Sequence, residues 1–347
     1  MQNTQATPTQ PPFSVTARKW MAENAIYVVL VFLIIGIAAQ DINFLSPNNF
    51  RNILINISTR VIIALGAGAI LITGGVDLSA GRIVGLAAVL SASMLQTPEY
   101  SRRFFPDLPQ LPLIIPILIP LIISLILGIV NGGIIARLNV PPFITTLGMT
   151  VIVYGMNSIY FDLPPNSSQP IGGLRPDFTN IGTGFIGPNG PFSLPYIVII
   201  AVIVSVITWV LFNQTTFGKN MYAIGGNREA AKVSGINVGL NLIGIYAFAG
   251  ALYGLAGVLE AARTGGATNN YGNSYELDAI AACVVGGVST SGGIGTVPGI
   301  LAGVVIFGVI NYGLTFIGVN PYWQQIIKGV IIVGAVAFDI AKYHRKK

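Results

Sequence analysis

The sequence predicts an all-α fold: a polytopic membrane protein built as a bundle of about ten transmembrane helices. Hydrophobic residues make up 53% of the chain and charged residues only 9%, whereas a soluble domain carries about 25% charged residues because its outer face meets water. The mean hydropathy is +0.73, and the apolar residues are gathered in runs long enough to cross a bilayer. Most of the outer face of this protein must therefore meet lipid.

The first apolar run extends from Ala25 to Ala39 and follows a polar, Pro-rich N-terminus with Arg18 and Lys19 near its end. Residues 1–20 are expected to be a disordered cytoplasmic segment. A basic flank before an apolar run is also the pattern of a signal peptide. Because Ala38-Ala39 is a weak cleavage site and many spans follow, we prefer an uncleaved first helix.

Nine further spans follow from the thickness of the bilayer. A hydrocarbon core of about 30 Å needs about 20 apolar residues at a helical rise of about 1.5 Å each. This criterion predicts spans near 53–73, 79–95, 112–135, 143–160, 194–212, 240–262, 277–291, 298–316 and 323–341. The membrane domain as a whole is expected to cover residues 21–342, followed by a basic cytoplasmic tail at 343–347.

Two of these spans are candidates for broken or re-entrant helices. The 79–95 run begins with a Gly-Arg pair, and the 277–291 run is short and Gly-rich. Interrupted backbone is tolerated at membrane depth only where protein or a water-filled cavity surrounds it. Both segments would then line the path of a solute.

The orientation follows from the distribution of Lys and Arg. With the N-terminus inside, the inner connections hold Arg18, Lys19, Arg137, Lys219, Arg228, Lys232, Lys342, Arg345, Lys346 and Lys347. The outer connections hold Arg51, Arg102, Arg103, Arg175 and Arg263. Since positive residues are concentrated in cytoplasmic loops, this excess predicts that both termini are cytoplasmic. An even number of helices agrees with that orientation.

Two long loops stand out between the spans. The periplasmic loop at 161–193 is rich in proline, which predicts a stiff, non-helical segment suited to a lid or a docking surface; a simple spacer is equally compatible. In the cytoplasmic loop at 213–239, Gly225-Gly226-Asn227 interrupts the chain, and Arg228 to Ser234 is expected to form a short helix ended by Gly235. Small residues on this helix allow close approach of another protein, and a solvated connection is the alternative.

This cytoplasmic segment also carries a resemblance. The stretch AIGGNREAAKVSGINVGLN (223–241) resembles the cytoplasmic coupling loop of permease subunits of ribose/galactose-type ABC sugar importers. Four further stretches match the same family: GGVDLSAGRIVGLAAV (74–89), NVPPFITTLGM (139–149), ELDAIAACVVGGVSTSGGIGTVPG (276–299) and INYGLTFIGVNPYWQQIIKG (310–329). The similarity runs from about Tyr27 to Lys347 and is greatest toward the galactose/methyl-galactoside permeases.

The resemblance implies a transport subunit of the cell inner membrane and a set of partners. These are a second copy of the chain, a cytoplasmic ATP-binding subunit, a periplasmic sugar-binding protein, membrane lipid, and a small sugar such as galactose or methyl-galactoside. It implies that ATP and Mg²⁺ bind the ATPase and that this chain itself binds no cofactor. The residues implied to couple to the ATPase are Gly225, Gly226, Asn227, Glu229, Ala230, Ala231, Lys232 and Gly235.

The motifs of an ATPase are missing from the sequence. A Walker A loop needs G-x-x-x-x-G-K-[ST], but Gly218-Lys219 is followed by Asn220, and the position of the first glycine is Asn213. A metal site is not expected, because the chain has one cysteine, Cys283, and one histidine. Nor does any long basic run alternate with aromatic residues as nucleic-acid binding would require.

Polar side chains within the predicted spans are candidates for the translocation path, because they can bond to sugar hydroxyls. These candidates are Asn131, Tyr154, Asn157, Glu260, Asn311 and Tyr312. Structural hydrogen bonding between helices is the alternative for each, and Glu260 lies one helical turn from Arg263, so an ion pair is expected if Glu260 is structural. Likewise, Asp77 and Arg82 are candidates to brace the turn at Gly74-Gly75, and Lys328 to reach the interface or a carbonyl.

Two other classes of function were weighed. A secondary transporter must carry its own coupling-ion site, usually intramembrane carboxylates or unwound half-helices; here only Glu260 and Asp77 qualify, and neither has a carboxylate partner in the sequence pattern. An intramembrane enzyme would need a His pair, a Ser-His arrangement or paired Asp residues within the spans, and none is present. The sequence therefore favours the permease.

Overall fold

The computed structural model describes residues 25–187 and 193–344, and the chain is helical over most of this length. Among the described residues, six helices are long and apolar enough to cross a membrane: α3 (Pro47–Ile72), α5 (Ile114–Arg137), α6 (Pro142–Asp162), α8 (Tyr196–Gln214), α11 (Val238–Thr264) and α13 (Val297–Phe316). Four further helices coincide with the remaining predicted spans: α2 (Ala25–Gln40), α4 (Ala80–Met94), α12 (Tyr275–Val285) and α14 (Pro321–His344). The chain is thus an all-helical, multi-pass membrane protein.

The short helices show where the bundle is interrupted. α12 has 11 residues, which cover only about 16 Å, so α12 alone does not cross a hydrocarbon core of about 30 Å. The non-helical segment 286–296 then leads to α13. α4 has 15 residues and is preceded by the non-helical segment 74–79. The interruption after α12 falls within the 277–291 run, as predicted, whereas the interruption before α4 precedes the 79–95 run, over which the helix is continuous from Ala80 to Met94.

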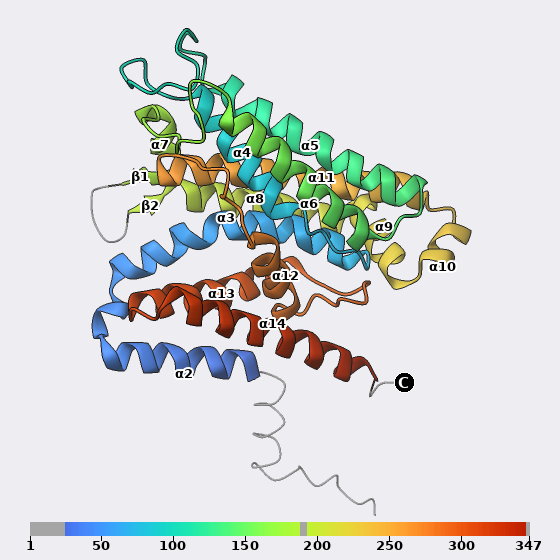
Figure 1. Ribbon diagram of the computed structural model, residues 1–347. Helices are drawn as coiled ribbons and strands as arrows, with labels where there is room; N and C mark the ends of the chain where they lie inside the picture. Colours follow the sequence, from blue (N-terminus) through green and yellow to red (C-terminus); the bar gives the residue numbers. More distant parts are fainter. Residues whose placement is uncertain (1–24, 188–192, 345–347) are drawn as a thin grey trace, which may run out of the picture.

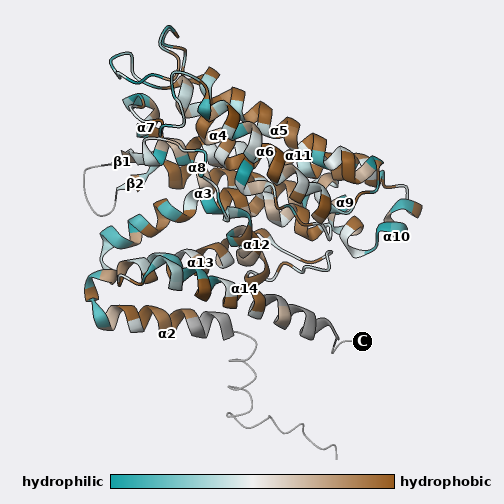
Figure 2. Cartoon of the chain, viewed as in Figure 1, coloured by the Kyte–Doolittle hydropathy of each residue, from teal (hydrophilic) through white to brown (hydrophobic). Residues whose placement is uncertain are grey.

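The helices form two groups, with α12 between them (Figure 1). The larger group contains α3, α4, α5, α6, α8 and α11, and the smaller contains α2, α13 and α14. α3 and α11 are buried over 78% and 67% of their most apolar stretches, whereas α5, α6 and α8 are buried over only 28%. The exposed sides of these three helices are apolar (Figure 2).

Short elements mark the two ends of the bundle (Figure 1). At one end lie the 3-10 helix η1 (Ile42–Leu45), α7 (Pro176–Thr183) and the antiparallel pair β1 (Phe185–Ile186) and β2 (Leu194–Pro195). At the opposite end lie α9 (Thr216–Gly226), α10 (Arg228–Val233) and the C-terminus of α14. The two long loops of the sequence are thus at opposite ends of the molecule.

Helix α7 corrects one prediction. We expected the 161–193 loop to be non-helical because of its prolines, but residues 176–183 form a helix. Pro176 occupies its first turn, where a missing N–H costs nothing and the fixed φ angle suits a helix, and Asp177 adds a negative charge near the N-terminus. Prolines here start a helix instead of preventing one. The prediction for the cytoplasmic loop is confirmed: α10 begins after Asn227, whose side chain accepts from the Ala230 N–H at 2.9 Å.

The non-helical segment before α4 is supplied with hydrogen-bond partners by neighbouring helices. Thr146 Oγ1 of α6 accepts from the Leu78 N–H at 3.1 Å, and Thr150 Oγ1 donates to the Leu78 carbonyl at 2.7 Å. The Ser79 N–H and hydroxyl both donate to Asp77 Oδ1, at 2.8 and 2.6 Å. Non-helical backbone in a membrane protein needs such partners, and these bonds hold the segment in a defined conformation.

Glycines bring the helices into close contact. A Cβ added at Gly250 of α11 would overlap the Ser124 carbonyl of α5, and one at Gly303 of α13 would overlap the Ala282 carbonyl of α12. Backbone lies directly against backbone at both places. Close approach of this kind is how helices associate in lipid, where no hydrophobic force drives them together.

Candidate functional site

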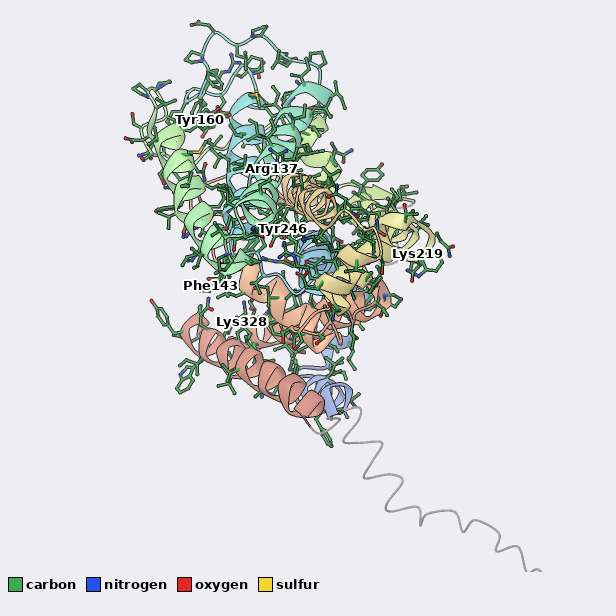
Figure 3. The ribbon with its side chains drawn as sticks, turned by 90° about the vertical axis from the view of Figure 1, so that its right-hand side faces the viewer. Arg137, Phe143, Tyr160, Lys219, Tyr246 and Lys328 are labelled. Atoms are coloured by element: carbon green, nitrogen blue, oxygen red, sulfur yellow. The ribbon has the colours of Figure 1, made fainter. Side chains whose placement is uncertain are left out.

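The first candidate site is the surface at the α9–α10 end. Of the eight residues expected to couple to an ATPase, six are exposed: Gly226, Asn227, Glu229, Ala230, Lys232 and Gly235. Ala231 is buried and Gly225 is half-buried. Figure 3 looks onto this end of the molecule and shows Lys219 of α9 at its edge. The structure thus gathers most of the predicted residues on one accessible surface.

An open, polar depression of about 700 Å³ adjoins α10. Its lining includes Arg228, Glu229 and Lys232 of α10, Ala136 of α5 and Asn139 of the α5–α6 connection. Next to these charges, the apolar side chain of Val233 is 89% exposed. Val233 was not predicted as a contact residue from the sequence, although it is an apolar residue at the end of a short polar helix. An exposed apolar side chain with a charged rim is suited to contact with another protein.

Gly225 has a different role, because it faces the interior. A Cβ added there would overlap the Ile72 carbonyl at the end of α3 and would lie 2.6 Å from the Gly293 nitrogen. The Gly293 N–H also donates to the Ile72 carbonyl at 2.8 Å, and the Tyr222 hydroxyl donates to the Gly295 carbonyl at 2.9 Å. Helix α9 is therefore held against both α3 and the 286–296 segment, and Gly225 permits that contact.

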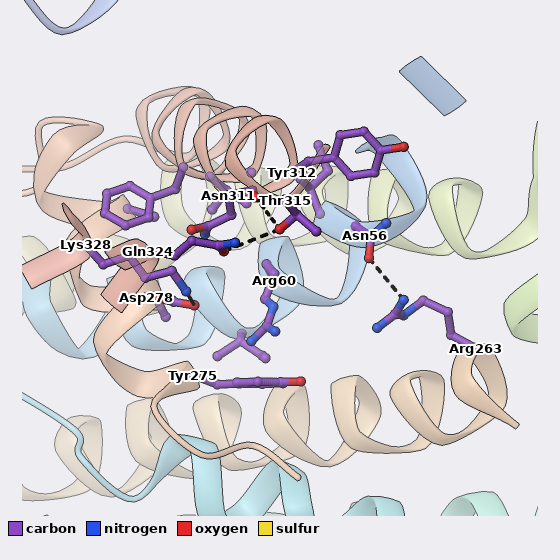
Figure 4. Close-up of a pocket in the computed structure, with 17 residues that line it drawn as sticks. Asn56, Arg60, Arg263, Tyr275, Asp278, Asn311, Tyr312, Thr315, Gln324 and Lys328 are labelled. Carbon is purple, nitrogen blue, oxygen red and sulfur yellow. Dashed lines mark hydrogen bonds and ion pairs between the residues drawn. The ribbon is translucent and has the colours of Figure 1, made fainter. Parts of the chain in front are cut away.

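The second candidate site is a cavity of about 430 Å³ between helices of the bundle (Figure 4). It is enclosed by α3, α12, α13, α14 and the end of α11. Its polar lining side chains are Asn56, Arg60, Arg263, Tyr275, Asp278, Asn311, Tyr312, Thr315, Gln324 and Lys328. A cavity of this size is within the range of sites for small molecules, and most of its lining residues are polar.

A buried carboxylate organises one side of this cavity. Glu260 is 2% exposed and accepts hydrogen bonds from Arg263 Nη2 at 2.7 Å, Thr59 Oγ1 at 2.9 Å and the Tyr275 hydroxyl at 3.1 Å. Arg263 in turn donates to Asn56 Oδ1 at 3.1 Å. The expected ion pair between Glu260 and Arg263 is therefore present, and it fixes side chains of three helices behind the cavity wall.

A second ion pair lies across the cavity. Lys328 Nζ of α14 is 3.2 Å from Asp278 Oδ2 of α12 (Figure 4). From the sequence, Lys328 was expected to extend to the interface or to a carbonyl. This expectation is wrong, because Lys328 pairs with a carboxylate on another helix, which spacing along the chain does not reveal. The pair connects the short helix α12 to α14.

Arg60 is one of the polar lining residues that were not predicted from the sequence, together with Asn56, Tyr275, Asp278, Thr315 and Gln324. Its guanidinium lies over the ring of Tyr275, with Cζ 3.2 Å from the ring centroid (Figure 4). The available signal was an arginine within the apolar run 53–73, since charged residues at membrane depth are rare and usually functional. It was overlooked because it belongs to none of the matching motifs.

The six path candidates divide into two groups. Asn311 and Tyr312 line the cavity, and Glu260 lies behind its wall. Asn131 is fully buried and donates to Ser79 Oγ at 3.0 Å, which is the structural alternative considered for it. Tyr154 is 42% exposed, and Asn157 is buried beside α4. These last three lie apart from the described residues that line the cavity.

Arg82 lies with this second group and away from the Gly74-Gly75 turn. Its guanidinium is 4.4 Å from the centroid of the Tyr154 ring, and Nη2 donates to Asn273 Oδ1 at 2.9 Å. The expectation that Arg82 braces the turn is therefore wrong. Asp77 instead accepts hydrogen bonds from Ser79 at the start of α4, and the turn itself is closed by backbone bonds from Gly74 and Gly75 to Leu71 and Ile70. Among the residues that the structure describes, no three His, Cys, Asp or Glu side chains are arranged to hold a metal ion.

The relatives found by comparison with known proteins are described as permeases. Residues 49–336 match the family described as the permease component of the branched-chain amino acid transport system. The galactose/methyl galactoside import permease of Salmonella typhimurium is 57% identical over 94% of this chain and 97% of its own length, and that of Escherichia coli is 56% identical with the same coverage. The ribose import permease of Bacillus subtilis is 40% identical over 91% of this chain and 92% of its own. No solved structure matches the chain.

Proposed function

The chain belongs to the permease family whose description matches residues 49–336. From that premise we propose that it is the transmembrane subunit of an ATP-driven importer for galactose or a methyl galactoside. The observation that carries the proposal is the 57% identity, over nearly the full length of both chains, to a permease named for those sugars. The chain is a transport subunit of the inner membrane and not an enzyme. In this proposal a separate ATPase subunit binds ATP and Mg²⁺, and this chain binds no cofactor.

The two ends of the molecule would then serve different partners. The ATPase would contact the α9–α10 end, which the exposed Val233 and its charged neighbours support. The periplasmic sugar-binding protein would contact the end with α7 and the β1–β2 pair. We further propose that the chain has ten membrane-embedded helical segments and that both termini are in the cytoplasm. A second copy of the chain would complete the transporter in the lipid bilayer. The C-terminus of α14 at the α10 end supports this orientation.

The contacts suggest how an ATPase could act on the cavity. Helix α9 is fixed to segment 286–296 through Gly225 and Tyr222. That segment joins α12 to α13, and both helices line the cavity. Binding of ATP, by moving α10 and α9, would therefore move two walls of the cavity. Coupling of this kind needs two states whose balance each partner shifts.

The experiment is reconstitution with the ATPase and the binding protein. Val233→Asp should reduce co-purification of the ATPase and ATP-dependent galactose uptake, because a charge replaces the exposed apolar contact. Ile186→Asp is the matched control: it changes an exposed apolar residue at the opposite end, 54% exposed, and should leave co-purification of the ATPase unchanged. Undiminished co-purification and uptake with Val233→Asp would contradict the assignment of this surface.

A secondary transporter is separated from an importer by the same preparation. The importer requires ATP and both partner proteins for uptake. If this chain alone accumulated galactose in vesicles that carry only a proton or sodium gradient, the proposed function would be wrong.

A further inference from the structure

An apolar groove of about 370 Å³ runs between α8 and α13, and α3 forms its floor. The floor consists of buried side chains such as Ile57 and Val61. The walls include Val202 and Trp209 of α8 and Val305 of α13, which are between 39% and 56% exposed. All three helices are long and apolar enough to cross a membrane. The groove is therefore an accessible feature on the side of the bundle, separate from the polar cavity at α12.

The two serines that line this groove turn their hydroxyl groups to their own helices. Ser58 Oγ donates to the Leu54 carbonyl at 2.7 Å, and Ser205 Oγ donates to the Ala201 carbonyl at 2.7 Å. The other lining residues are valine, leucine, isoleucine, alanine, proline and tryptophan. A polar ligand would lose its hydrogen bonds to water here without replacement, so the occupant that fits the groove is apolar.

The dimensions of the groove fit one hydrocarbon chain and exclude a helix. Along α8 the groove extends from Val198 to Trp209, which is about 16 Å at a helical rise of about 1.5 Å per residue. This length is close to half of a hydrocarbon core about 30 Å thick, the depth of one lipid leaflet. A helix about 10 Å wide and about 16 Å long occupies roughly 1,300 Å³, more than three times the volume of the groove. A helix of a second copy could only lie over the groove and leave it unfilled, whereas an extended acyl chain can enter it.

A positive charge lies at one end of the groove. Arg51 is one helical turn before Leu54, the first groove residue of α3, and shares a face of α3 with Ser58. Its Nη1 donates to Ser193 Oγ at 3.1 Å, and its Cζ lies 4.8 Å from the centroid of the Phe185 ring. These contacts hold the guanidinium beside the segment that leads into α8. An apolar groove that ends at a positioned cation is complementary to an amphiphile with an anionic head group.

We propose that the chain binds one membrane phospholipid at this position, with an acyl chain in the groove between α8 and α13 and the phosphate at Arg51. Because the surrounding bilayer is as apolar as the groove, the selectivity for a bound lipid comes from close packing of the chain and from the charge on the phosphate. Such a lipid touches α3, α8 and α13 together. The inference goes beyond the proposed function and does not depend on the identity of the transported solute.

The test uses the fluorescence of Trp209, which lines the groove. The chain has three tryptophans, so Trp20→Phe and Trp323→Phe leave Trp209 as the only one. The full-length chain in detergent micelles is titrated with phosphatidylglycerol that carries bromine on one acyl chain, because bromine quenches a tryptophan that it contacts. The matched reference keeps only Trp323, which is 62% exposed and lies outside the described groove residues. The same titration is repeated on the complex with its ATPase in nanodiscs.

We expect the quenching of Trp209 to saturate at a single lipid per chain, whereas the quenching of Trp323 should rise gradually without saturating at that ratio. Val202→Phe narrows the groove and should raise the half-quenching concentration about tenfold. Ile203→Phe, at the neighbouring residue, which is 52% exposed and outside the groove, should leave it unchanged. Arg51→Gln should also raise it about tenfold, because a charged donor to phosphate is lost, and Arg102→Gln, at an exposed arginine, should not.

A second measurement does not depend on whether these variants fold. Diacylglycerol with the same brominated chains lacks the phosphate, and we expect it to quench Trp209 of the unaltered groove with a half-quenching concentration about tenfold higher. The thermal unfolding midpoint should rise on addition of phosphatidylglycerol, because a ligand that binds the folded state stabilises it.

Four results would overturn the inference. Unsaturable quenching of Trp209, like that of Trp323, would show only the general lipid shell. Equal half-quenching concentrations for Val202→Phe and Ile203→Phe would place the lipid outside the groove, and equal values for diacylglycerol and phosphatidylglycerol would remove the phosphate contact. Loss of Trp209 quenching in the assembled complex would show that a protein surface, such as that of a second copy, covers the groove in place of lipid.

Discussion

Replacement of Glu260 by alanine should destabilise the bundle severely. The carboxylate is 2% exposed and accepts four hydrogen bonds, two of them from Arg263, one from Thr59 and one from Tyr275. Breaking a buried ion pair by removing one partner costs about 3–5 kcal/mol, and a hydrogen bond between membrane helices is worth about 0.6 kcal/mol on average. Since Arg263 is 22% exposed and can regain some solvent, we expect a loss of about 3–4 kcal/mol.

The conservative variant Glu260→Gln sharpens this prediction. Glutamine keeps an acceptor for Thr59 and Tyr275 but removes the charge opposite Arg263, so it should lose about half as much stability as Glu260→Ala. The midpoint of thermal unfolding is measured on the purified full-length chain in detergent. Glu99→Ala, which removes an exposed carboxylate from the outer connection, is the matched control and should change stability by less than about 0.5 kcal/mol. If Glu260→Ala and Glu99→Ala unfolded at the same temperature, the structural role of the Glu260 network would be refuted.

Three further predictions follow from the contacts. Gly225→Ala should lower the yield of folded protein, because its methyl group would overlap backbone, whereas Gly226→Ala, with open space around it, should not; equal yields by size-exclusion chromatography would contradict this contact. Thr146→Val should lower the unfolding midpoint by leaving the Leu78 N–H without a partner, at a cost of about 1–3 kcal/mol, and an unchanged midpoint would count against it. Tyr222→Phe should destabilise the protein modestly at neutral pH. Burial raises the pKa of the Tyr222 phenol above its usual 10.0, so the stability that this residue contributes is complete below about pH 10 and is lost only as the pH rises through the raised value. If the loss of stability caused by Tyr222→Phe changed between about pH 6 and 8, this reasoning would be refuted.

The helices themselves were accessible from the sequence because hydrophobic length is a strong signal. Each of the ten predicted spans coincides with a helix, since in lipid every backbone group must be satisfied within its own segment. The short length of α12 was signalled by Gly286 and Gly287, which directly follow it. Helix α9 was not predicted, because its apolar residues are too few to suggest a span, and α7 was concealed by its prolines.

The cavity could not be predicted in the same way, because it depends on which helices become neighbours. Arg60 and Tyr275 are far apart in the sequence and meet only when α12 packs against α3. Asn131 and Asn311 were equivalent as sequence candidates, yet the first is buried against Ser79 and the second lines the cavity. Spacing along the chain assigns residues to helices, and only the packing decides which of them share a site.

The meeting of Gly225, Gly293 and the end of α3 has a mechanical consequence. Where side chains separate two elements, a small displacement of one is absorbed by changes of rotamer. Here the peptide groups touch directly, so no soft layer exists between them. A shift of α9 toward these groups, even by a fraction of an ångström, must therefore be passed on to the backbone of Ile72 and Gly293. The contact therefore acts as a stiff linkage, because its glycines place no side chain between the backbones.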